Sequence, residues 1–233
     1  MDWKEIEISE DGTFFEHKGI RLFNKQFTEA LKYHPPGIAP AKDESGSYHI
    51  NSTGQPVYPQ RYTRTFGFYC DRAAVIQKDK WFHVNTVGER IYEQFYAWAG
   101  NYQQDLCTVR DFSGSYFHID KSGQRVYKEN FAYAGDFYEG YACVRGQDGL
   151  YLHIRKDGTP LNGKRYRDLG VFHKGFAAAK DSHGWFHINK HGVELYPQRY
   201  QAIEPFYNGF ALVADFSFKK IILSESGEEL MEV

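Results

Sequence analysis

The chain has 233 residues with 28 Lys and Arg against 30 Asp and Glu, so its formal net charge is −2. A near-neutral chain lacks the clustered cations with which proteins bind DNA or RNA, and no apolar run approaches the about 20 residues that span a bilayer. Only three cysteines are present, which excludes a disulfide framework and makes a reducing compartment the expectation.

The N-terminal residues 1–5 are charged and lack the apolar core of a secretory signal. We therefore expect a cytoplasmic protein, and export by a route that needs no such signal stays open. The unusual feature of the composition is its 18 Tyr, 19 Phe and 22 Gly residues. This combination is typical of many short β-strands joined by tight turns.

One glycine recurs along the chain at intervals of 34 or 35 residues. Its seven positions, called the turn glycines below, are Gly19, Gly54, Gly88, Gly123, Gly158, Gly192 and Gly227. An apolar residue stands four positions before each of them and an aliphatic residue three positions after. Aromatic residues follow eight and fourteen positions after the first six. Such regular spacing predicts seven copies of one supersecondary unit, which form a single repeat domain over residues 1–233.

Within one copy, a small-residue strand such as 175–179 comes first and ends in an Asp/Gly/Ser turn. Next comes an alternating strand, in which Phe186 and Ile188 flank His187, and then a turn that ends at Gly192. A further short strand carries Leu195 and Tyr196. Each copy is therefore predicted to be a meander of three antiparallel strands. The aromatic-rich segment 200–206 forms a fourth strand or crosses to the next copy.

Each copy is too small to enclose a core of its own, so the copies must stack on their neighbours. Two all-β architectures satisfy this requirement, a closed seven-bladed β-propeller and an open superhelical β-solenoid. We favour the closed ring, because an open stack needs polar capping copies, whereas the first and last copies here keep the apolar columns. A length of about 35 residues is short for a blade and favours the open alternative.

The segment Trp185 to Gly192, followed by Tyr200 and by residues 206–211, resembles the tryptophan–glycine (WG) repeat family of bacterial proteins. The resemblance covers essentially the whole chain. Phe82 and Phe186 replace the glycine that follows the tryptophan in the family pattern, and Ser47, Tyr116 and Tyr151 stand in place of the tryptophan in other copies. The resemblance implies a binding scaffold and supplies no catalytic residues.

A histidine stands five residues before the turn glycine in five copies. This histidine column consists of His49, His83, His118, His153 and His187. It has two interpretations: convergent imidazoles that bind a metal or an anion, or one structural hydrogen bond that is repeated between copies. We favour the structural interpretation, because equivalent positions in successive repeats lie too far apart to share one ion.

The loop after the +14 aromatic is the best candidate for a ligand site, since binding residues concentrate on loops that a rigid framework positions. Its candidate residues are Tyr69, Tyr138, His173, Tyr207 and Asn208. Such side chains stack on and hydrogen-bond a sugar or a peptide. The alternative is that they are wedges that pack between sheets.

The sequence offers little support for catalysis. A carboxylate recurs beside the first turn of six copies, at Asp43, Asp79, Asp111, Asp148, Asp181 and Asp215. Asp beside Gly and Ser is expected to hydrogen-bond its own turn backbone. We therefore expect a binding scaffold without enzyme activity or cofactor, most simply for a protein partner and not for nucleic acid or a membrane. Glycan recognition is the alternative, and an enzyme with a repeat-embedded site is the third hypothesis.

Overall fold

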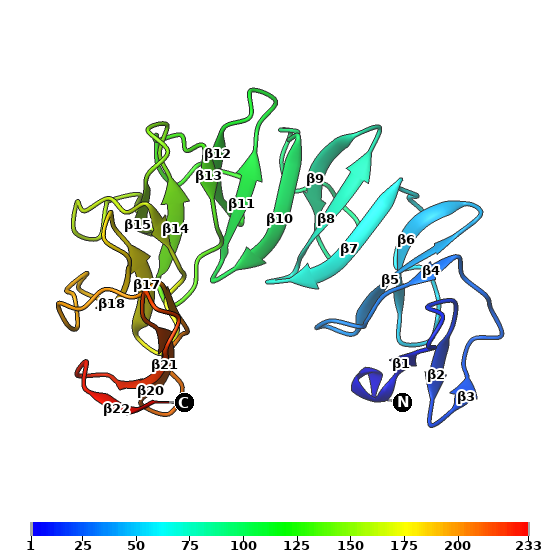
Figure 1. Cartoon of the computed structure of the whole chain (residues 1–233). Helices are drawn as coiled ribbons and strands as arrows, with labels where there is room; N and C mark the ends of the chain where they lie inside the picture. Colours follow the sequence, from blue (N-terminus) through cyan, green and yellow to red (C-terminus); the bar gives the residue numbers. More distant parts are fainter. Residues whose placement is uncertain (1, 233) are drawn as a thin grey trace. The chain divides into compact units, whose positions relative to one another are not determined.

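The computed structural model describes residues 2–232, which form seven small antiparallel sheets preceded by the 3-10 helix η1 (Trp3–Glu5) (Figure 1). This confirms the predicted all-β fold of seven antiparallel meanders. Six sheets have three strands in sequential order and the last has four. No helix within residues 2–232 is long and apolar enough to cross a membrane.

The chain divides into two compact units, which are treated separately here. The N-terminal unit comprises residues 2–114 and 118–125, and the C-terminal unit residues 115–117 and 126–232. The single repeat domain expected over residues 1–233 stays a prediction, as does closure of the sheets into a ring.

The N-terminal unit contains the first three sheets and most of the fourth. Their strands are β1 (Glu7–Ile8), β2 (Phe15–His17) and β3 (Ile20–Arg21); β4 (Glu29–Ala30), β5 (Ile38–Asp43) and β6 (Gly46–Asn51); β7 (Arg64–Tyr69), β8 (Arg72–Gln77) and β9 (Lys80–Val84); and β10 (Trp98–Gln103), β11 (Leu106–Arg110) and β12 (Tyr116–Asp120).

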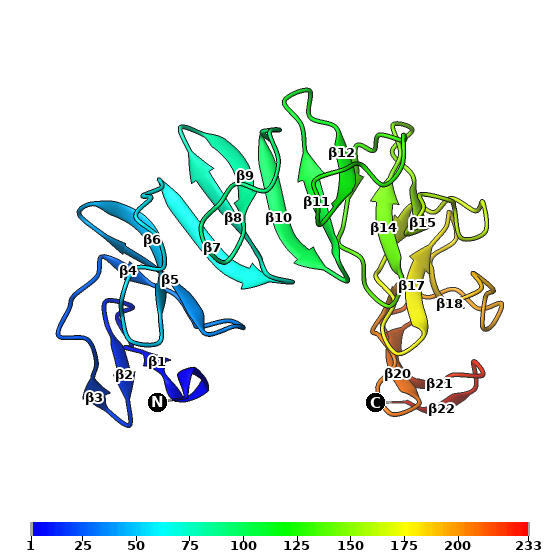
Figure 2. The ribbon, with the colours of Figure 1, turned by 180° about the vertical axis from the view of Figure 1, so that it is seen from behind.

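The C-terminal unit contains the last three sheets, which Figure 2 shows from behind. Their strands are β13 (Tyr133–Ala134), β14 (Tyr141–Arg145) and β15 (Tyr151–Arg155); β16 (Asp168–Leu169), β17 (Phe176–Lys180) and β18 (Trp185–Asn189); and β19 (Ala202–Ile203), β20 (Phe210–Ala214), β21 (Lys220–Ser224) and β22 (Glu229–Glu232).

The sixth sheet shows how each repeat is assembled. Ala178 of β17 lies opposite His187 of β18, and the registers on either side follow in order. The segment after β18 continues the sheet through isolated bridges, in which Ile188 pairs with Glu194 and Trp185 with Tyr200. In the first and last repeats this segment contains a strand, β3 and β22 respectively. The aromatic segment 200–206 crosses to the next sheet, because Ala202–Ile203 within it form β19, the first strand of the seventh sheet.

The seven turn glycines occupy equivalent turns, and each has a positive φ between 71° and 84°. This confirms the repeat spacing predicted from the sequence. At Gly88, a Cβ atom would lie 2.4 Å from the ring of Tyr58, which belongs to the preceding repeat. Glycine is therefore required there for the backbone conformation and for the close approach of the neighbouring ring.

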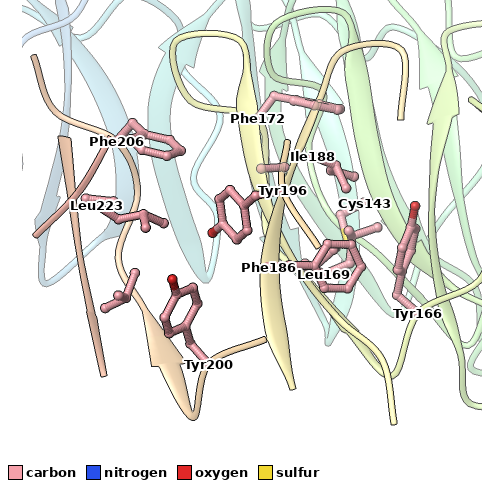
Figure 3. Packing of buried hydrophobic residues seen from close by; sticks show 14 of the residues in the cluster. Cys143, Tyr166, Leu169, Phe172, Phe186, Ile188, Tyr196, Tyr200, Phe206 and Leu223 are labelled. Atoms are coloured by element: carbon pink, nitrogen blue, oxygen red, sulfur yellow. The ribbon is translucent and has the colours of Figure 1, made fainter. Parts of the chain in front are cut away.

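The +14 aromatic column is buried between repeats, as predicted. Phe172 is 1 % exposed, and its ring lies 4.3 Å from the ring of His153 in the fifth sheet and 5.0 Å from that of Tyr141. Phe206 occupies the equivalent position against His187 in the next interface, with the ring centroids 4.3 Å apart. Figure 3 shows this packing in the C-terminal unit. These rings supply the core that a single repeat lacks.

Candidate functional site

Four histidines of the column each join their sheet to the next one through the imidazole Nε2. This atom lies 2.8–2.9 Å from a backbone carbonyl seventeen residues farther along the chain. The pairs are His49 with Phe66, His83 with Gly100, His153 with Gly170 and His187 with Glu204. At Phe66 and Gly100 the carbonyl lies where the ladder between the first two strands shifts register, so the histidine satisfies an acceptor that the ladder leaves unpaired.

The carbonyl partner determines which nitrogen of the neutral imidazole carries the proton, because a carbonyl oxygen can only accept a hydrogen bond. Nε2 therefore carries the proton and Nδ1 is the acceptor. A tyrosine hydroxyl donates to Nδ1 at 2.5 Å in the pairs His83 with Tyr92 and His187 with Tyr196, and His49 makes the same contact with Tyr58. Each of these histidines thus has both ring nitrogens occupied by the protein.

Burial lowers the pKa of His49, His83, His153 and His187 to about 4, although the carbonyl contact opposes the shift. His118 is equally buried. In the part of the chain that the structure describes, no cluster of three or more His, Cys, Asp or Glu residues has the geometry of a metal site. The geometry therefore supports the structural interpretation of the column.

The fifth repeat departs from this pattern. Asn162 stands where the other histidine-bearing repeats carry a tyrosine, and its amide donates instead to the Gly192 carbonyl at 3.0 Å. The Nδ1 atom of His153 is buried and has no hydrogen-bond partner within residues 2–232. This acceptor is one of the few unsatisfied buried polar atoms of the chain.

The candidate residues Tyr138, His173 and Tyr207 lie at the tips of successive hairpins in the C-terminal unit. These three residues, together with Glu139 and Lys174, are called the tip row below. Tyr138 and Tyr207 are 51 % and 56 % exposed. The ring of His173 lies 5.1 Å from that of Tyr207, and the Lys174 ammonium lies 5.4 Å from the Tyr207 ring centroid.

Glu139 fixes the relative position of two tips. Its carboxylate accepts hydrogen bonds from the backbone N–H groups of Lys174 and Gly175 at 2.7 and 3.0 Å and forms an ion pair with Lys190 at 2.9 Å. Burial opposes ionisation, but the Lys190 ammonium and the two N–H groups hold the Glu139 pKa below its usual range. The two tips therefore form a preorganised surface.

The other two candidate residues lie elsewhere or have a local explanation. Tyr69 belongs to the N-terminal unit, where its half-buried ring lies 4.7 Å from that of His34. Asn208 has a φ of 52° in the turn between Tyr207 and Phe210, a conformation that Asn tolerates. The structure thus brings four of the five candidates, Asn208 included, onto neighbouring repeats, and only Tyr69 lies elsewhere.

Five of the six carboxylates beside the first turn behave as predicted, and Asp79 accepts no hydrogen bond from residues 2–232. Asp181 accepts from the backbone N–H of His183 at 2.7 Å and forms an ion pair with Arg199 at 2.8 Å. Asp148 similarly accepts from the Leu150 N–H at 3.2 Å and pairs with Arg165 at 3.1 Å. These carboxylates shape turns and hold the following segment in place.

A second surface could not be predicted from the sequence columns, because it depends on the register between strands. At the ends of the fifth and sixth sheets opposite the hairpin tips, a cation on the second strand has at least one aromatic cross-strand neighbour. Tyr133, Arg145 and Tyr151 are direct cross-strand neighbours in the fifth sheet. In the sixth sheet Lys180 lies between Asp168 and Trp185. The sequence signal that could have revealed this surface is the Lys or Arg at the end of the second strand in successive repeats.

Comparison with known proteins identifies the repeat. The chain contains WG repeats: residues 50–81, 119–151 and 185–214 match the family described as WG containing repeat. No curated protein matches the chain. Each matched range contains one turn glycine and the two aromatic residues that follow it, and the third range also contains His187.

Solved structures with related folds have little sequence identity. The computationally designed Ika8 protein is 11 % identical with a TM-score of 0.50, over 98 % of this chain and 83 % of that one. BamB from Moraxella catarrhalis is 12 % identical with a TM-score of 0.49, over 100 % and 88 % of the two chains. The WD40 β-propeller domain of Doa1 is 13 % identical with a TM-score of 0.37, over 89 % and 86 %. At this identity the comparison concerns the fold alone.

Proposed function

We propose that this WG-repeat protein is a binding scaffold whose tip row docks a protein partner. The observation that carries the proposal is the exposure of Tyr138 and Tyr207 on the hairpins that flank the His173 hairpin, together with the contacts by which Glu139 fixes the Tyr138 tip to the His173 tip. Tyrosine supplies a large contact area at a low cost in conformational entropy and is enriched among the residues that dominate interface energetics. A rigid framework lowers the ordering cost of binding further.

The proposal includes no catalytic step. Five of the six recurrent carboxylates are engaged in turns, the four histidines described above are neutral and hydrogen-bonded at Nε2, and burial raises the pKa of Cys143 to about 12. None of these groups has the exposure and activation that a general base or a nucleophile requires. The three cysteines form no disulfide within residues 2–232, which supports a reducing compartment as its proposed location.

Glycan binding is the second candidate function, and the pairing of His173 with Tyr207 is the observation that favours it. An exposed tyrosine face beside a polar ring can stack on a sugar and hydrogen-bond its hydroxyl groups. The tips of the C-terminal unit carry both features.

Site-specific photo-crosslinking in producing cells tests the proposal. A photoreactive residue at position 138 or 207 is expected to give one discrete protein adduct, and one at Phe216, which is 58 % exposed but lies outside the tip row, none. The absence of adducts from both tip positions, or equal adducts from position 216, would reject the docking surface. Glycan-array binding that Tyr207→Ala abolishes would favour the second candidate.

A further inference from the structure

The surface at the other end of the sheets consists of two rows of three residues. In the fifth sheet Arg145 lies directly opposite Tyr133 on one side and Tyr151 on the other. In the sixth sheet Lys180 occupies the same place between Asp168 and Trp185. Side chains of direct cross-strand partners project from the same face of a sheet. These six residues are called the cross-strand row.

The cross-strand row lies on an accessible part of the sheets. Tyr133 is 44 % exposed, and Arg145 and Tyr151 are half-buried. The residues that alternate with them, Ala134 and Val144, are 3 % and 0 % exposed. Cys143 and His153 share the face of Arg145 and Tyr151 and are 6 % and 3 % exposed, so the cation and its aromatic neighbours lie at the end of a face that is otherwise buried.

Both cations are positioned by rings and not by carboxylates. The Arg145 guanidinium carbon lies 5.9 Å from the Tyr151 ring centroid, and the Lys180 ammonium lies 5.3 Å from that of Trp185. Neither cation has an ion-pair or hydrogen-bond partner among the residues that the structure describes, and the Nε atom of Arg145 is buried without one. Their positive charges are therefore available to a ligand.

Two other arginines of the same repeats are paired with carboxylates. Arg165 pairs with Asp148 at 3.1 Å, and Arg199 pairs with both Asp181 and Glu194 at 2.8 Å. Arg145 and Lys180 differ from these arginines because each lies over an aromatic ring and forms no ion pair with residues 2–232.

The two rows are neighbours along the C-terminal unit. Tyr151 exchanges backbone hydrogen bonds with Tyr166 at 2.8 Å, and Arg167, the next residue, donates its N–H to the Lys180 carbonyl at 2.8 Å. On the other side, the Tyr116 ring lies 5.7 Å from that of Tyr133. The fifth and sixth sheets therefore present their cations side by side.

We propose that the cross-strand row binds an extended acidic peptide segment of a protein partner. Arg145 takes one carboxylate through its planar guanidinium, Lys180 takes a second, and the aromatic side chains pack against the residues between them. Packed sheets lie about 10 Å apart and an extended chain rises about 3.3 Å per residue, which favours acidic residues three positions apart. The inference rests on the proposed protein-binding function but uses a different surface.

The exposed carboxylate of Asp168 favours a peptide over a continuous polyanion. Asp168 lies opposite Lys180, so a chain with a charge on every residue would place a negative group beside it. Like charges at such a distance are destabilising. A peptide with spaced carboxylates reaches both cations and can place a neutral residue at Asp168.

Fluorescence anisotropy with the whole protein tests the inference. The probe is a labelled peptide of four Glu-Leu-Thr repeats, and its counterpart carries Gln in place of Glu. We expect the Glu peptide to bind, the Gln peptide to bind at least about tenfold more weakly, and the affinity to fall as salt rises. Arg145→Gln and Lys180→Gln should each weaken the Glu peptide by about tenfold, with an unchanged melting temperature as the control for folding.

The matched control is Lys174→Gln, which removes a cation that also lies over a tyrosine ring, but in the tip row. It should leave peptide affinity unchanged.

Equal binding of both peptides, or an unchanged affinity for the Glu peptide in both cross-strand variants, would overturn the inference. Loss of binding in Lys174→Gln alone would move the peptide to the tip row and leave the proposed function intact. Tighter binding of an oligonucleotide or polygalacturonate that depends on Arg145 would replace the peptide by another polyanion. Peptide binding without adducts at positions 138 and 207 would retain the inference and reject the tip row.

Discussion

The hydroxyl of Tyr196 donates to Nδ1 of His187 at 2.5 Å. The Tyr196 side chain also packs against the next turn glycine, Gly227, where an added Cβ atom would lie 2.4 Å from the Cβ of Tyr196. One tyrosine thus satisfies a buried histidine in its own repeat and covers the turn of the next. Tyr58 and Tyr92 make the same pair of contacts one repeat apart. A single tyrosine therefore contributes both a hydrogen bond and an apolar contact at the junction of two repeats.

Removing the hydroxyl alone should reproduce the unsatisfied state of the fifth repeat. Tyr196→Phe leaves Nδ1 of His187 buried without a donor while it retains the ring against Gly227. A buried unsatisfied acceptor costs about 1–3 kcal/mol, so the free energy of unfolding in urea should fall by that amount. A change of less than 0.5 kcal/mol would mean that the contact contributes nothing to stability.

The opposite change is expected at the fifth repeat. Asn162→Tyr introduces the donor that His153 lacks and the ring that covers the turn glycine in other repeats. The free energy of unfolding should rise by about 1–2 kcal/mol in the same urea assay. Asn162→Phe is the control, since it supplies the ring without the donor and should recover only part of the gain. A destabilised Asn162→Tyr variant would show that this interface has closed around the smaller side chain.

Acid should destabilise the protein through the buried histidines. The pKa of His49, His83, His153 and His187 is lowered by burial to about 4, against about 6.5 in an unfolded chain. The unfolded state therefore binds more protons between these values, and stability should fall as the pH drops from about 6.5 to about 4.

The measurement for this prediction is the pH dependence of the free energy of unfolding. Each histidine contributes a slope of up to about 1.4 kcal/mol per pH unit in that window. His187→Gln should reduce the proton uptake on unfolding by about one. A flat profile between pH 6.5 and 4 would contradict the assignment.

Truncation of the +14 column should be costly, because these rings form the interface core. Phe172→Ala removes a ring that is 1 % exposed and contacts both His153 and Tyr141, so it should cost about 3–5 kcal/mol. Val171→Ala, at a neighbouring residue that is 55 % exposed, is the control and should cost less than about 0.5 kcal/mol. Urea unfolding of both variants would decide it, and a similar small cost for the two would place Phe172 outside the core.

A comparison of two glycines with similar backbone conformations separates the energetic cost of backbone strain from that of steric clash. Gly88 and Gly114 have φ values of 80° and 89°, but only at Gly88 would a Cβ meet a neighbour, the Tyr58 ring. Both Ala variants should lose about 1–2 kcal/mol from the left-handed backbone, and Gly88→Ala a further 1–3 kcal/mol or so from the clash. Thermal unfolding compares them directly. Equal losses would mean that the Tyr58 ring moves aside freely.

Much of the architecture could be predicted from single positions in the repeat. The turn glycines, the buried +14 rings and the carboxylates at the first turn each follow from local chemistry, and the structure places them as expected. The repeated pentapeptide at 58–62 and 196–200 has a local explanation too. Its arginines, Arg61 and Arg199, donate to carbonyls of their own loops and lie over the rings of Tyr48 and Phe186.

The sequence by itself determined the period of the repeat, because glycine, small residues and aromatics recur where turns, close strand packing and interface filling demand them. Only the tertiary structure decided what each polar side chain meets. The carbonyl that accepts a hydrogen bond from His187 belongs to a residue seventeen positions farther along the chain, and the aromatic neighbours of Arg145 come from the strands on either side. Such partners depend on the register between strands, which no single-residue column encodes.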